Sequence, residues 1–320
     1  MYASQSNVQG SIYAEMERIR ASAVRHNEPV GLATALLHQS GWFVQWKEGP
    51  KEALEAIMGR VAQDPRHHSL RIVHSSHGPR LLDGPWSMAI VQCADPPGDM
   101  EQRVDKLRDD LEQGRQYSPP AVWRRLSTPM RHPKAAQQGE PDAFQRVLVC
   151  AAVRMASFTL VEWLARHHWE EVVHRRFAGA RDLDVGTDYV DFAEGGRVLR
   201  VIAMARHGLA VPLTRAFLPD YSHIVLLLSG EQEHDLALLE RVAEGCASLV
   251  SPPLLLGLAQ DNSVHHDMFA LAHRRGLIYL DAQGNIEDGR ACWEAIAPQL
   301  AAWRHSANTS VWPVAPLRFG

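Results

Sequence analysis

The chain has 320 residues, of which 46% are hydrophobic and 22% are charged, with a formal net charge of −4 and a pI near 6.5. These values are ordinary for a soluble globular protein of two domains, or of one large domain, and they argue against a general nucleic-acid binder. No apolar run reaches the roughly 18 residues of a membrane span. The N-terminus has no basic start followed by an apolar stretch, so we expect no signal peptide and a cytoplasmic protein. The four cysteines form no CxxC pair, which predicts free thiols and no zinc site.

Helix and strand patterns alternate along the first 95 residues. Apolar residues at helical spacing predict a first helix around Ile12, Met16, Ile19 and Ala23. The remaining patterns predict strands at residues 31–37, 41–49, 70–74 and 86–92, and a second helix at residues 53–62 that ends before Pro65. With one more strand at the extreme N-terminus, this order predicts an α+β, ferredoxin-like domain with two helices on one face of a mixed sheet.

Gln45 lies in the middle of the apolar segment Gly41–Gly49. A neutral amide in such a strand is unfavourable unless it is hydrogen-bonded. Gln carries a donor and an acceptor, which it exchanges by rotating its amide, so it suits a site that reorganises hydrogen bonds around a ligand. The alternative is a Gln on the solvated face of a half-buried strand.

Residues 96–142 differ in character and predict a linker that contains helical pieces. Proline pairs interrupt the segment, and Met100, Val104, Leu107 and Leu111 indicate one charged amphipathic helix. Its apolar seam is expected either to pack on the sheet of the first domain or to form a dimer contact.

The second half, residues 143–305, predicts an α/β domain followed by a tail at residues 306–320. Strands are expected at residues 146–153, 189–192, 198–203, 224–228, 254–259 and 276–280, and helices at residues 158–169, 233–247 and 289–303. Buried apolar strands that alternate with helices indicate a parallel sheet covered on both faces.

Residues 2–92 carry a set of motifs in a recognisable order. The set comprises Tyr2-x-Ser4, Ser22, Asn27, Gly31, Phe43-x-Gln45-x-x-Glu48-Gly49, Asp64-x-Arg66-His67, Arg80 and Trp86-Ser87-Met88. This part of the chain resembles the BLUF family, blue-light sensors that bind FAD.

The resemblance implies a flavin between the two helices of the first domain. It implies that Asn27 hydrogen-bonds the flavin carbonyl and imide edge, and that Arg66, with His67 next to it, lies near the polar rim of the site. Tyr2 would donate an electron and a proton, and Gln45 would reorganise its amide. Trp86 and Met88 would pass the change to the last strand.

Four features depart from the family's pattern, and one of them is the stretch Gly31-Leu32-Ala33-Thr34, where the family usually has Gly-Ile-Thr-Gly. His26 replaces the first of two consecutive Asn residues, and Lys47 replaces an apolar residue on the face of Gln45, where it requires a buried charge or a rearranged strand. The strand that usually runs into the tyrosine is short here, so we expect Tyr2 to lie in a frayed end.

The second half resembles Ras-like small GTPases, with a degenerate nucleotide site. The segment after the first strand, which includes Arg154 and Thr159, lacks the Gly and Lys that a P-loop needs. Thr187 falls in a switch-like segment, and Asp261 ends a strand that is similar to the base-reading strand. The resemblance implies a pseudo-GTPase that does not bind GTP, and an ordinary doubly wound α/β domain is the alternative.

Together these observations predict a non-enzymatic signalling protein. A flavin sensor domain with FAD as cofactor would be coupled to a pseudo-GTPase output domain that acts through protein partners, with a homodimer as a further option. The alternative is a flavin-free scaffold in which both domains are degenerate and serve as partner-binding surfaces. We expect neither a nucleic-acid partner nor a metal.

Overall fold

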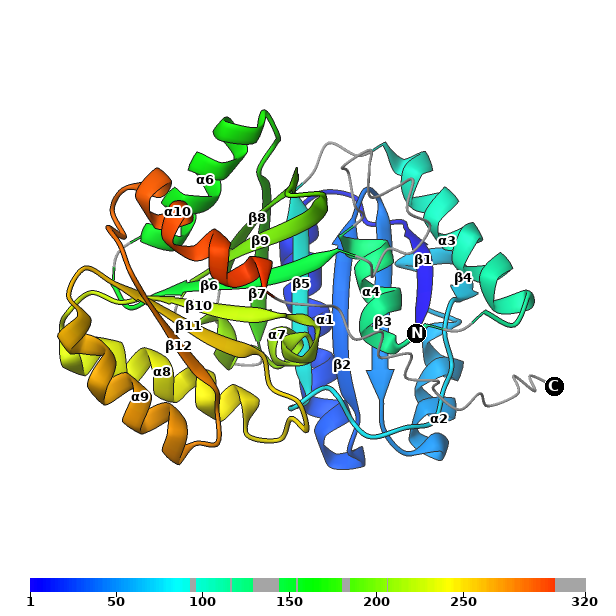
Figure 1. Cartoon of the computed structure of the whole chain (residues 1–320). Helices are drawn as coiled ribbons and strands as arrows, with labels where there is room; N and C mark the ends of the chain where they lie inside the picture. Colours follow the sequence, from blue (N-terminus) through cyan, green and yellow to red (C-terminus); the bar gives the residue numbers. More distant parts are fainter. Residues whose placement is uncertain are drawn as a thin grey trace. The chain divides into compact units, whose positions relative to one another are not determined.

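A computed structural model describes residues 1–92, 96–115, 117–128, 144–153, 155–179, 185–205 and 207–302. The chain divides into two compact units (Figure 1). Of the described residues, those up to residue 128 and residues 176–179 form unit 1, and those within 144–175 and 185–302 form unit 2. The predicted tail lies outside the described residues.

Unit 1 has the predicted ferredoxin-like arrangement of a mixed sheet and two helices. Its elements are β1 (Tyr2–Ser6), α1 (Ile12–Asn27), a 3₁₀ turn η1 (Glu28–Val30), β2 (Ala33–Gln39), β3 (Trp42–Glu48), α2 (Lys51–Val61), β4 (His67–Ile72), β5 (Trp86–Gln92), α3 (Pro97–Glu112) and α4 (Pro119–Ser127). The strand order is β4-β1-β3-β2-β5. Only β2 and β5 pair in parallel among these neighbours, and the other three pairs are antiparallel.

The hairpin between β2 and β3 fixes which side chains face which side of the sheet. Gln39 pairs with Trp42, so the loop has two residues, Ser40 and Gly41, and both have positive φ, as a type I′ turn requires. Because side chains alternate along a strand, Phe43, Gln45 and Lys47 share one face, and Trp42 and Trp46 lie on the other.

Helices α3 and α4 cover the face that carries Trp46. The Trp46 ring lies 6.2 Å from the ring of Trp123 in α4, and Arg71 of β4 forms ion pairs with Glu101 and Asp105 of α3. Of the four seam residues of α3, Met100, Val104 and Leu107 are at most 3% exposed, and Leu111 is half-buried. This burial favours the first of the two expectations for the seam. Both helices also belong to unit 1, not to a separate linker.

Unit 2 is an α/β unit in which helices lie on both faces of a sheet (Figure 1). Its elements are β6 (Gln145–Ala151), α6 (Ala156–His168), β7 (Val173–Gly179), which crosses the unit boundary, β8 (Val185–Glu194), β9 (Arg197–Met204), η2 (Gly208–Ala210), α7 (Pro212–Arg215), η3 (Leu218–Asp220), β10 (His223–Leu227), α8 (Gln232–Cys246), β11 (Leu254–Ala259), η4 (Asn262–Val264), α9 (His265–Arg274), β12 (Tyr279–Gln283) and α10 (Gly289–Ala301).

The unit 2 sheet has the order β12-β11-β10-β6-β9-β8. Neighbouring strands are parallel from β12 to β9, and β8 pairs antiparallel with β9. One apolar core lies under α6 and α10, and a second lies under α8 and α9. The last strand begins three residues later than predicted, because Gly276 takes positive φ and ends the preceding helical turn. The sequence patterns also missed β7 and α9.

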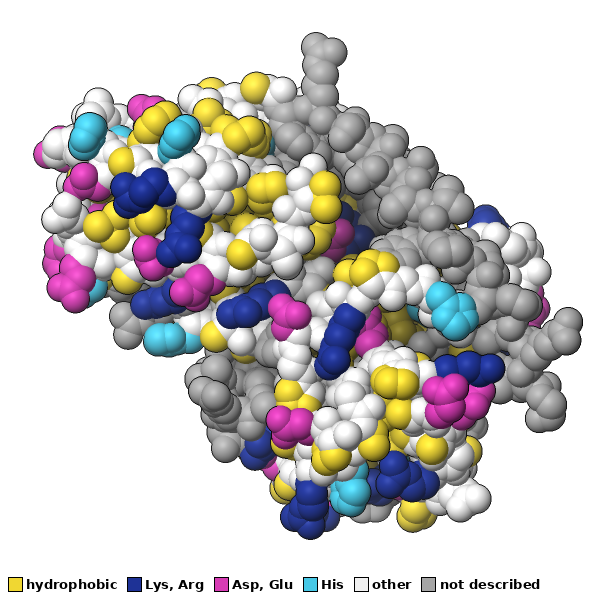
Figure 2. Space-filling view, turned by 90° about the horizontal axis from the view of Figure 1, so that it is seen from below, with side chains coloured by type: hydrophobic (Ala, Val, Ile, Leu, Met, Phe, Trp, Pro, Cys, Tyr) yellow, Lys and Arg dark blue, Asp and Glu magenta, His cyan; other side chains and the backbone are white. Residues whose placement is uncertain are grey.

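The surface charges are mixed, and the described cysteines are not paired in disulfides. On the face shown in Figure 2, basic and acidic side chains are interspersed. Cys150, Cys246 and Cys292 are buried free thiols. None of the described helices is both long enough and apolar enough to span a membrane.

Candidate functional site

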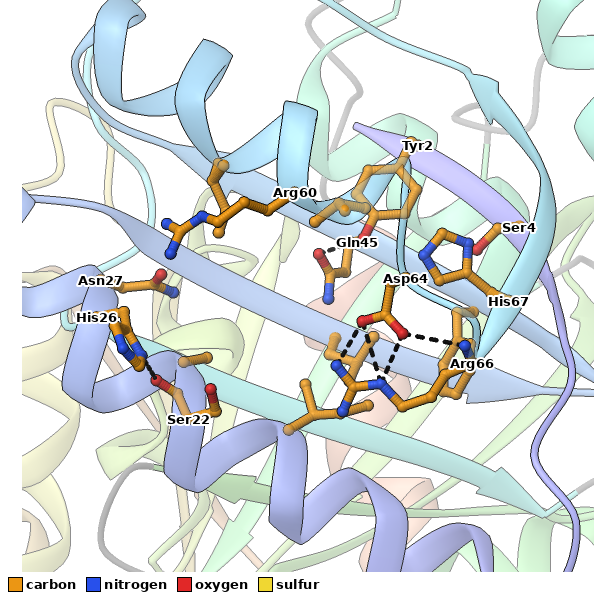
Figure 3. A pocket seen from close by; sticks show the side chains of 16 residues that line it. Tyr2, Ser4, Ser22, His26, Asn27, Gln45, Arg60, Asp64, Arg66 and His67 are labelled. Atoms are coloured by element: carbon orange, nitrogen blue, oxygen red, sulfur yellow. Dashed lines mark hydrogen bonds and ion pairs between the residues drawn. The ribbon is translucent and has the colours of Figure 1, made fainter.

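A cavity of about 210 Å³ lies between the sheet of unit 1 and helices α1 and α2 (Figure 3). Five of the seven residues that the sequence assigned to cofactor binding line it: Tyr2, Asn27, Gln45, Arg66 and His67. The wall also contains Ser4, Ile19, Ser22, Ala23, His26, Leu36, Phe43, Ile57, Arg60, Val61 and Asp64.

The side chains of Tyr2 and Gln45 form a hydrogen bond in the wall of the cavity. The two residues pair directly across β1 and β3, and Tyr2 Oη donates to Gln45 Oε1 at 2.5 Å. Both are buried, at 4% and 7% exposure. Burial, reinforced by the charge of Asp64, raises the pKa of the Tyr2 phenol, so the hydroxyl remains a donor. Gln45 is therefore not on a solvated face, and its Nε2 makes no hydrogen bond within the part of the chain that the structure describes.

Strand β1 holds Tyr2 firmly, so the expectation of a frayed end is wrong. The strand pairs with β3 on one side and β4 on the other. The α-amino group of Met1 donates to the His74 carbonyl at 2.5 Å, and the Met1 carbonyl accepts from the amides of Val73 and His74. Burial lowers the pKa of this amino group to about 5. Two neighbouring strands therefore fix the position of the Tyr2 ring.

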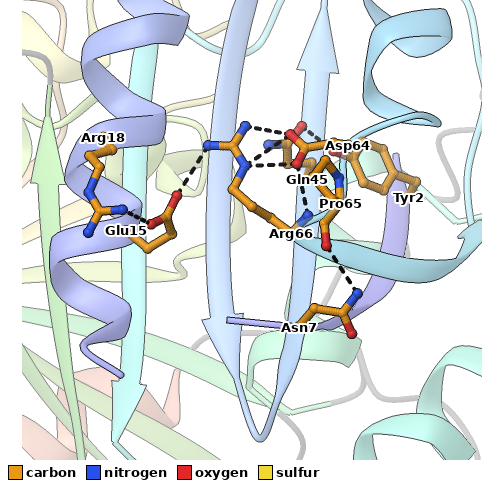
Figure 4. A network of polar contacts seen from close by, with 8 residues as sticks. All are labelled: Tyr2, Asn7, Glu15, Arg18, Gln45, Asp64, Pro65 and Arg66. Carbon is orange, nitrogen blue, oxygen red and sulfur yellow. Dashed lines mark hydrogen bonds and ion pairs between the residues drawn. The ribbon is translucent and has the colours of Figure 1, made fainter. Parts of the chain in front are cut away.

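A polar network closes one end of the cavity (Figure 4). Asp64 accepts from Arg66 Nε at 2.8 Å and pairs with its Nη2 atom, while Arg66 Nη1 reaches Glu15 Oε1 of α1 at 3.3 Å. Hydrogen bonds from Arg66 hold the pKa of Asp64 below its usual value, and those to Asp64 raise the pKa of Arg66. Arg66 is therefore fixed at the rim and its charge is balanced by carboxylates.

Asn27 and Lys47 meet at the hydroxyl group of Thr34. Asn27 Nδ2 donates to Thr34 Oγ1 at 3.0 Å, and Lys47 Nζ approaches the same oxygen at 3.4 Å. Lys47 keeps the face of Gln45 and is half-buried, so of the two expectations for this residue the structure shows the buried charge. Burial, with a smaller contribution from Arg60, lowers the pKa of Lys47 to about 8.

Trp86 and Met88 do not line the cavity but pack directly behind it. Both are in β5 and form a core cluster with Met16 of α1 and with Leu36 and Phe43, two residues of the cavity wall. This position suits the role that the resemblance implied for them, which is to pass a change at Gln45 to the last strand. In a close-packed core, a shift of wall residues displaces their neighbours.

Two polar atoms of the cavity wall have no hydrogen-bond partner among the described residues. They are Ser4 Oγ and Gln45 Nε2. Buried polar atoms are normally paired, and exceptions call for an explanation such as a missing ligand or water. Both atoms fit a flat, largely apolar ligand that carries hydrogen-bonding groups at one edge, as a flavin ring does.

Two charged residues of the cavity wall, Arg60 and Asp64, went unassigned at the sequence level. Asp64 was noted only as part of a motif, although it anchors Arg66. Arg60 follows Ile57 by three residues and precedes Val61, so helical spacing places all three on the face of α2 that lines the cavity. That spacing could have predicted Arg60 as a residue of the cavity wall.

No hydrogen bond or ion pair joins the residues of the predicted degenerate nucleotide site in the described ranges. Arg154 lies outside those ranges. Thr159 is exposed in α6, Thr187 is buried in β8, and Asp261 caps η4 by accepting from the Ser263 amide at 2.9 Å. Among the described residues no cluster of His, Cys, Asp and Glu could hold a metal ion.

Comparison with known proteins identifies unit 1. Residues 1–89 match the family model described as sensors of blue-light using FAD. Over 119 residues the chain is 40% identical to the photoactivated adenylate cyclase subunit beta of Euglena gracilis and 37% identical to that of Euglena longa. Each alignment covers 35% of this chain and 14% of the cyclase subunit, so the chain matches only a small part of these relatives.

Solved structures of BLUF proteins also appear among the similar folds. The dark-state structure of BlrB aligns with 24% identity and a TM-score of 0.27, covering 39% of this chain and 88% of BlrB. A bacterial light-regulated adenylyl cyclase aligns over 68% of this chain and 82% of its own, with 12% identity and a TM-score of 0.28. With the family match over residues 1–89, the N-terminal part of this chain is a BLUF domain, from a family of FAD-binding blue-light sensors.

Proposed function

We propose that this protein binds FAD between α1 and α2 and senses blue light. The observation that carries the proposal is the buried hydrogen bond of 2.5 Å from Tyr2 to Gln45 in the wall of the cavity. It joins a phenol, which is an oxidisable proton donor, to an amide that can exchange its donor and acceptor by rotation. The free Nε2 group of Gln45 is then available to a ligand.

Other residues of the wall would hold the ligand. Asn27 is buried and has an amide oxygen left over after donating to Thr34. Arg66, fixed by Asp64, would lie at the polar rim of the flavin site. The rearrangement of Gln45 would pass to Trp86 and Met88, which pack behind Leu36 and Phe43.

We infer that unit 2 is a degenerate Ras-like domain that acts through protein partners. Support comes from its sheet, in which one antiparallel hairpin, β8–β9, flanks an otherwise parallel series whose first strand, β6, lies internally. The segment 151–159 still lacks Gly and Lys, so it has neither the backbone freedom nor the cation with which a P-loop holds phosphates. We therefore propose a non-enzymatic output domain.

The cyclase activity in the names of the relatives is not carried over to this chain. The alignments with the Euglena proteins cover 35% of it, and the family match ends at residue 89. Nothing in those matches extends over the greater part of unit 2.

Flavin binding is tested by incubating the purified chain with FAD and removing free ligand by gel filtration. A yellow protein with about one flavin per chain supports the proposal, and a colourless protein that takes up no FAD contradicts it. A colourless protein with a stable partner that binds equally in darkness and light would instead support the flavin-free scaffold. For unit 2, GTP turnover that is abolished by changing Thr187 or Asp261 would contradict a non-enzymatic role.

A further inference from the structure

The cavity is too small to enclose a whole FAD molecule. Its volume of about 210 Å³ lies below the roughly 300–1,000 Å³ of pockets that bury drug-sized ligands, and FAD is larger than most of these. The flat ring system can enter between α1 and α2, but the diphosphate and the adenosine must lie outside. The charges at the mouth of the cavity therefore decide where the anionic tail is favoured.

One end of the cavity repels a phosphate. Asp64 is the only carboxylate among the sixteen wall residues, and it lies at this end with Arg66. Arg66 is already paired with Asp64 and Glu15, so its positive charge is compensated by two negative ones. A diphosphate placed here would be repelled by the two carboxylates, because the Arg66 guanidinium group already pairs with them.

The opposite end carries positive charge without a counter-ion. Arg60 of α2 is exposed, and its guanidinium group points towards Asn27 and His26 of α1, away from Asp64 (Figure 3). Within the described ranges, neither Arg60 nor Lys47 forms an ion pair. Arg60 acts on Lys47 as a nearby like charge, which indicates that the two cations are neighbours. Glu48, the carboxylate next to Lys47 in sequence, is occupied by the Trp46 indole and by the amides of Leu81 and Leu82.

We propose that Arg60, supported by the charge of Lys47, binds the diphosphate of FAD at the mouth of the cavity, so that the site selects phosphorylated flavins over riboflavin. A guanidinium group suits this task because its fork of N–H donors matches phosphate oxygens. The inference rests on the proposed function, since it assumes that the flavin ring enters the cavity.

The test compares the affinities of FAD, FMN and riboflavin for the full-length chain by flavin fluorescence titration. The wild-type protein is expected to bind FAD and FMN more tightly than riboflavin, with a preference that declines as salt is added. In Arg60→Gln the ratio of FAD to riboflavin affinity should fall about fivefold, as for a solvent-exposed ion pair at the upper end of its range. Lys51→Gln is the matched control, because it removes one exposed positive charge from the same helix, outside the cavity wall.

Four results overturn the inference. Equal affinities for the three flavins in the wild-type protein would do so while leaving flavin binding intact. An unchanged FAD to riboflavin ratio in Arg60→Gln, or an equal loss in Lys51→Gln, would place recognition of the tail elsewhere. Failure to bind any of the three flavins would contradict the proposed function itself, and the inference with it.

Discussion

At the scale of single residues, Tyr2 and Gln45 form the centre of the site. The resemblance to the BLUF family allowed both to be placed in a predicted flavin site, but the sequence could not show that Tyr2 is held rigidly. That depends on pairing of β1 with two strands and on the contacts of Met1 with Val73 and His74, which are more than 70 residues away. Backbone pairing between segments this far apart produces no pattern in the local sequence, so it could not be predicted from the residues around Tyr2.

Replacement of Tyr2 by Phe tests the role of its hydroxyl group. Phe keeps the ring but cannot donate to Gln45, so the light-induced spectral shift should be abolished while flavin remains bound. The free energy of unfolding should fall by about 1 kcal/mol for the lost hydrogen bond. Absorption spectra before and after blue light measure the first effect, and Tyr13→Phe, at an exposed tyrosine, is the control. A normal shift in Tyr2→Phe would exclude the proposed switch.

Lys47 predicts a pH-dependent contribution to stability. Its pKa is about 8 in the folded chain and near 10.5 when unfolded, so the unfolded chain binds more protons between these values. Stability should therefore rise with pH from about 8 to 10.5, and below pH 8 the buried charge is unfavourable throughout.

Lys47→Met should remove this pH dependence. At pH 7 its free energy of unfolding should exceed that of the wild type by about 1–2 kcal/mol, a figure reduced for the partial exposure of the side chain. The difference should shrink towards pH 10. Urea unfolding at several pH values measures it, with Lys51→Met as the exposed control. A difference that is the same at pH 7 and pH 10 would show that Lys47 does not titrate as described.

At the scale of elements, the sequence predicted most strands and long amphipathic helices but missed α4, β7 and α9, and it left open whether the α3 seam packs on the sheet. The prolines around residue 119 suggested a linker, yet Pro119 and Pro120 occupy the first turn of α4, where a missing N–H is harmless. Ser118 caps the helix by accepting from the Ala121 amide. Trp46 is apolar and faces away from the cavity. Its presence indicated that a further element must cover that face of the sheet.

Trp123→Ala tests whether α4 stabilises unit 1. Trp123 is 2% exposed and packs against Trp46, so its truncation should lower the free energy of unfolding by about 3–5 kcal/mol. Denaturant unfolding measures the change. Tyr13→Ala, at a site that is 53% exposed, should change stability by no more than about 0.5 kcal/mol. Equal effects of the two substitutions would argue against a structural role for α4.

The β8–β9 hairpin contains a buried ion pair that makes a further prediction. Arg200 Nε donates to Asp191 Oδ1 at 2.7 Å, and both side chains are almost fully buried. Asp191→Asn removes the carboxylate charge from this buried ion pair and should destabilise the chain by about 3–5 kcal/mol. The double variant Asp191→Leu/Arg200→Met should recover most of this loss in denaturant unfolding, because it removes both charges. A double variant as unstable as the single one would contradict the explanation.

At the scale of the whole molecule, the sequence predicted a ferredoxin-like unit and an α/β unit, joined by a linker at residues 96–142. The Pro-rich composition of residues 96–142 suggested a spacer, whereas burial of the α3 seam assigns α3 and α4 to unit 1. Composition reports local flexibility, and it does not show whether a helix finds a surface to cover. For unit 2, the sequence shows that the Gly and Lys residues of a P-loop are absent. It contains no comparable motif from which a protein partner could be predicted.

The account depends on the claim that a flavin lies against Gln45 and that light changes their hydrogen bonding. The most direct measurement is the absorption spectrum of the purified full-length chain, loaded with FAD, in darkness and under blue light. We predict a flavin spectrum that shifts slightly to the red on illumination and returns in the dark. A protein that shows no bound flavin, or one whose flavin spectrum does not change with light, would contradict the account.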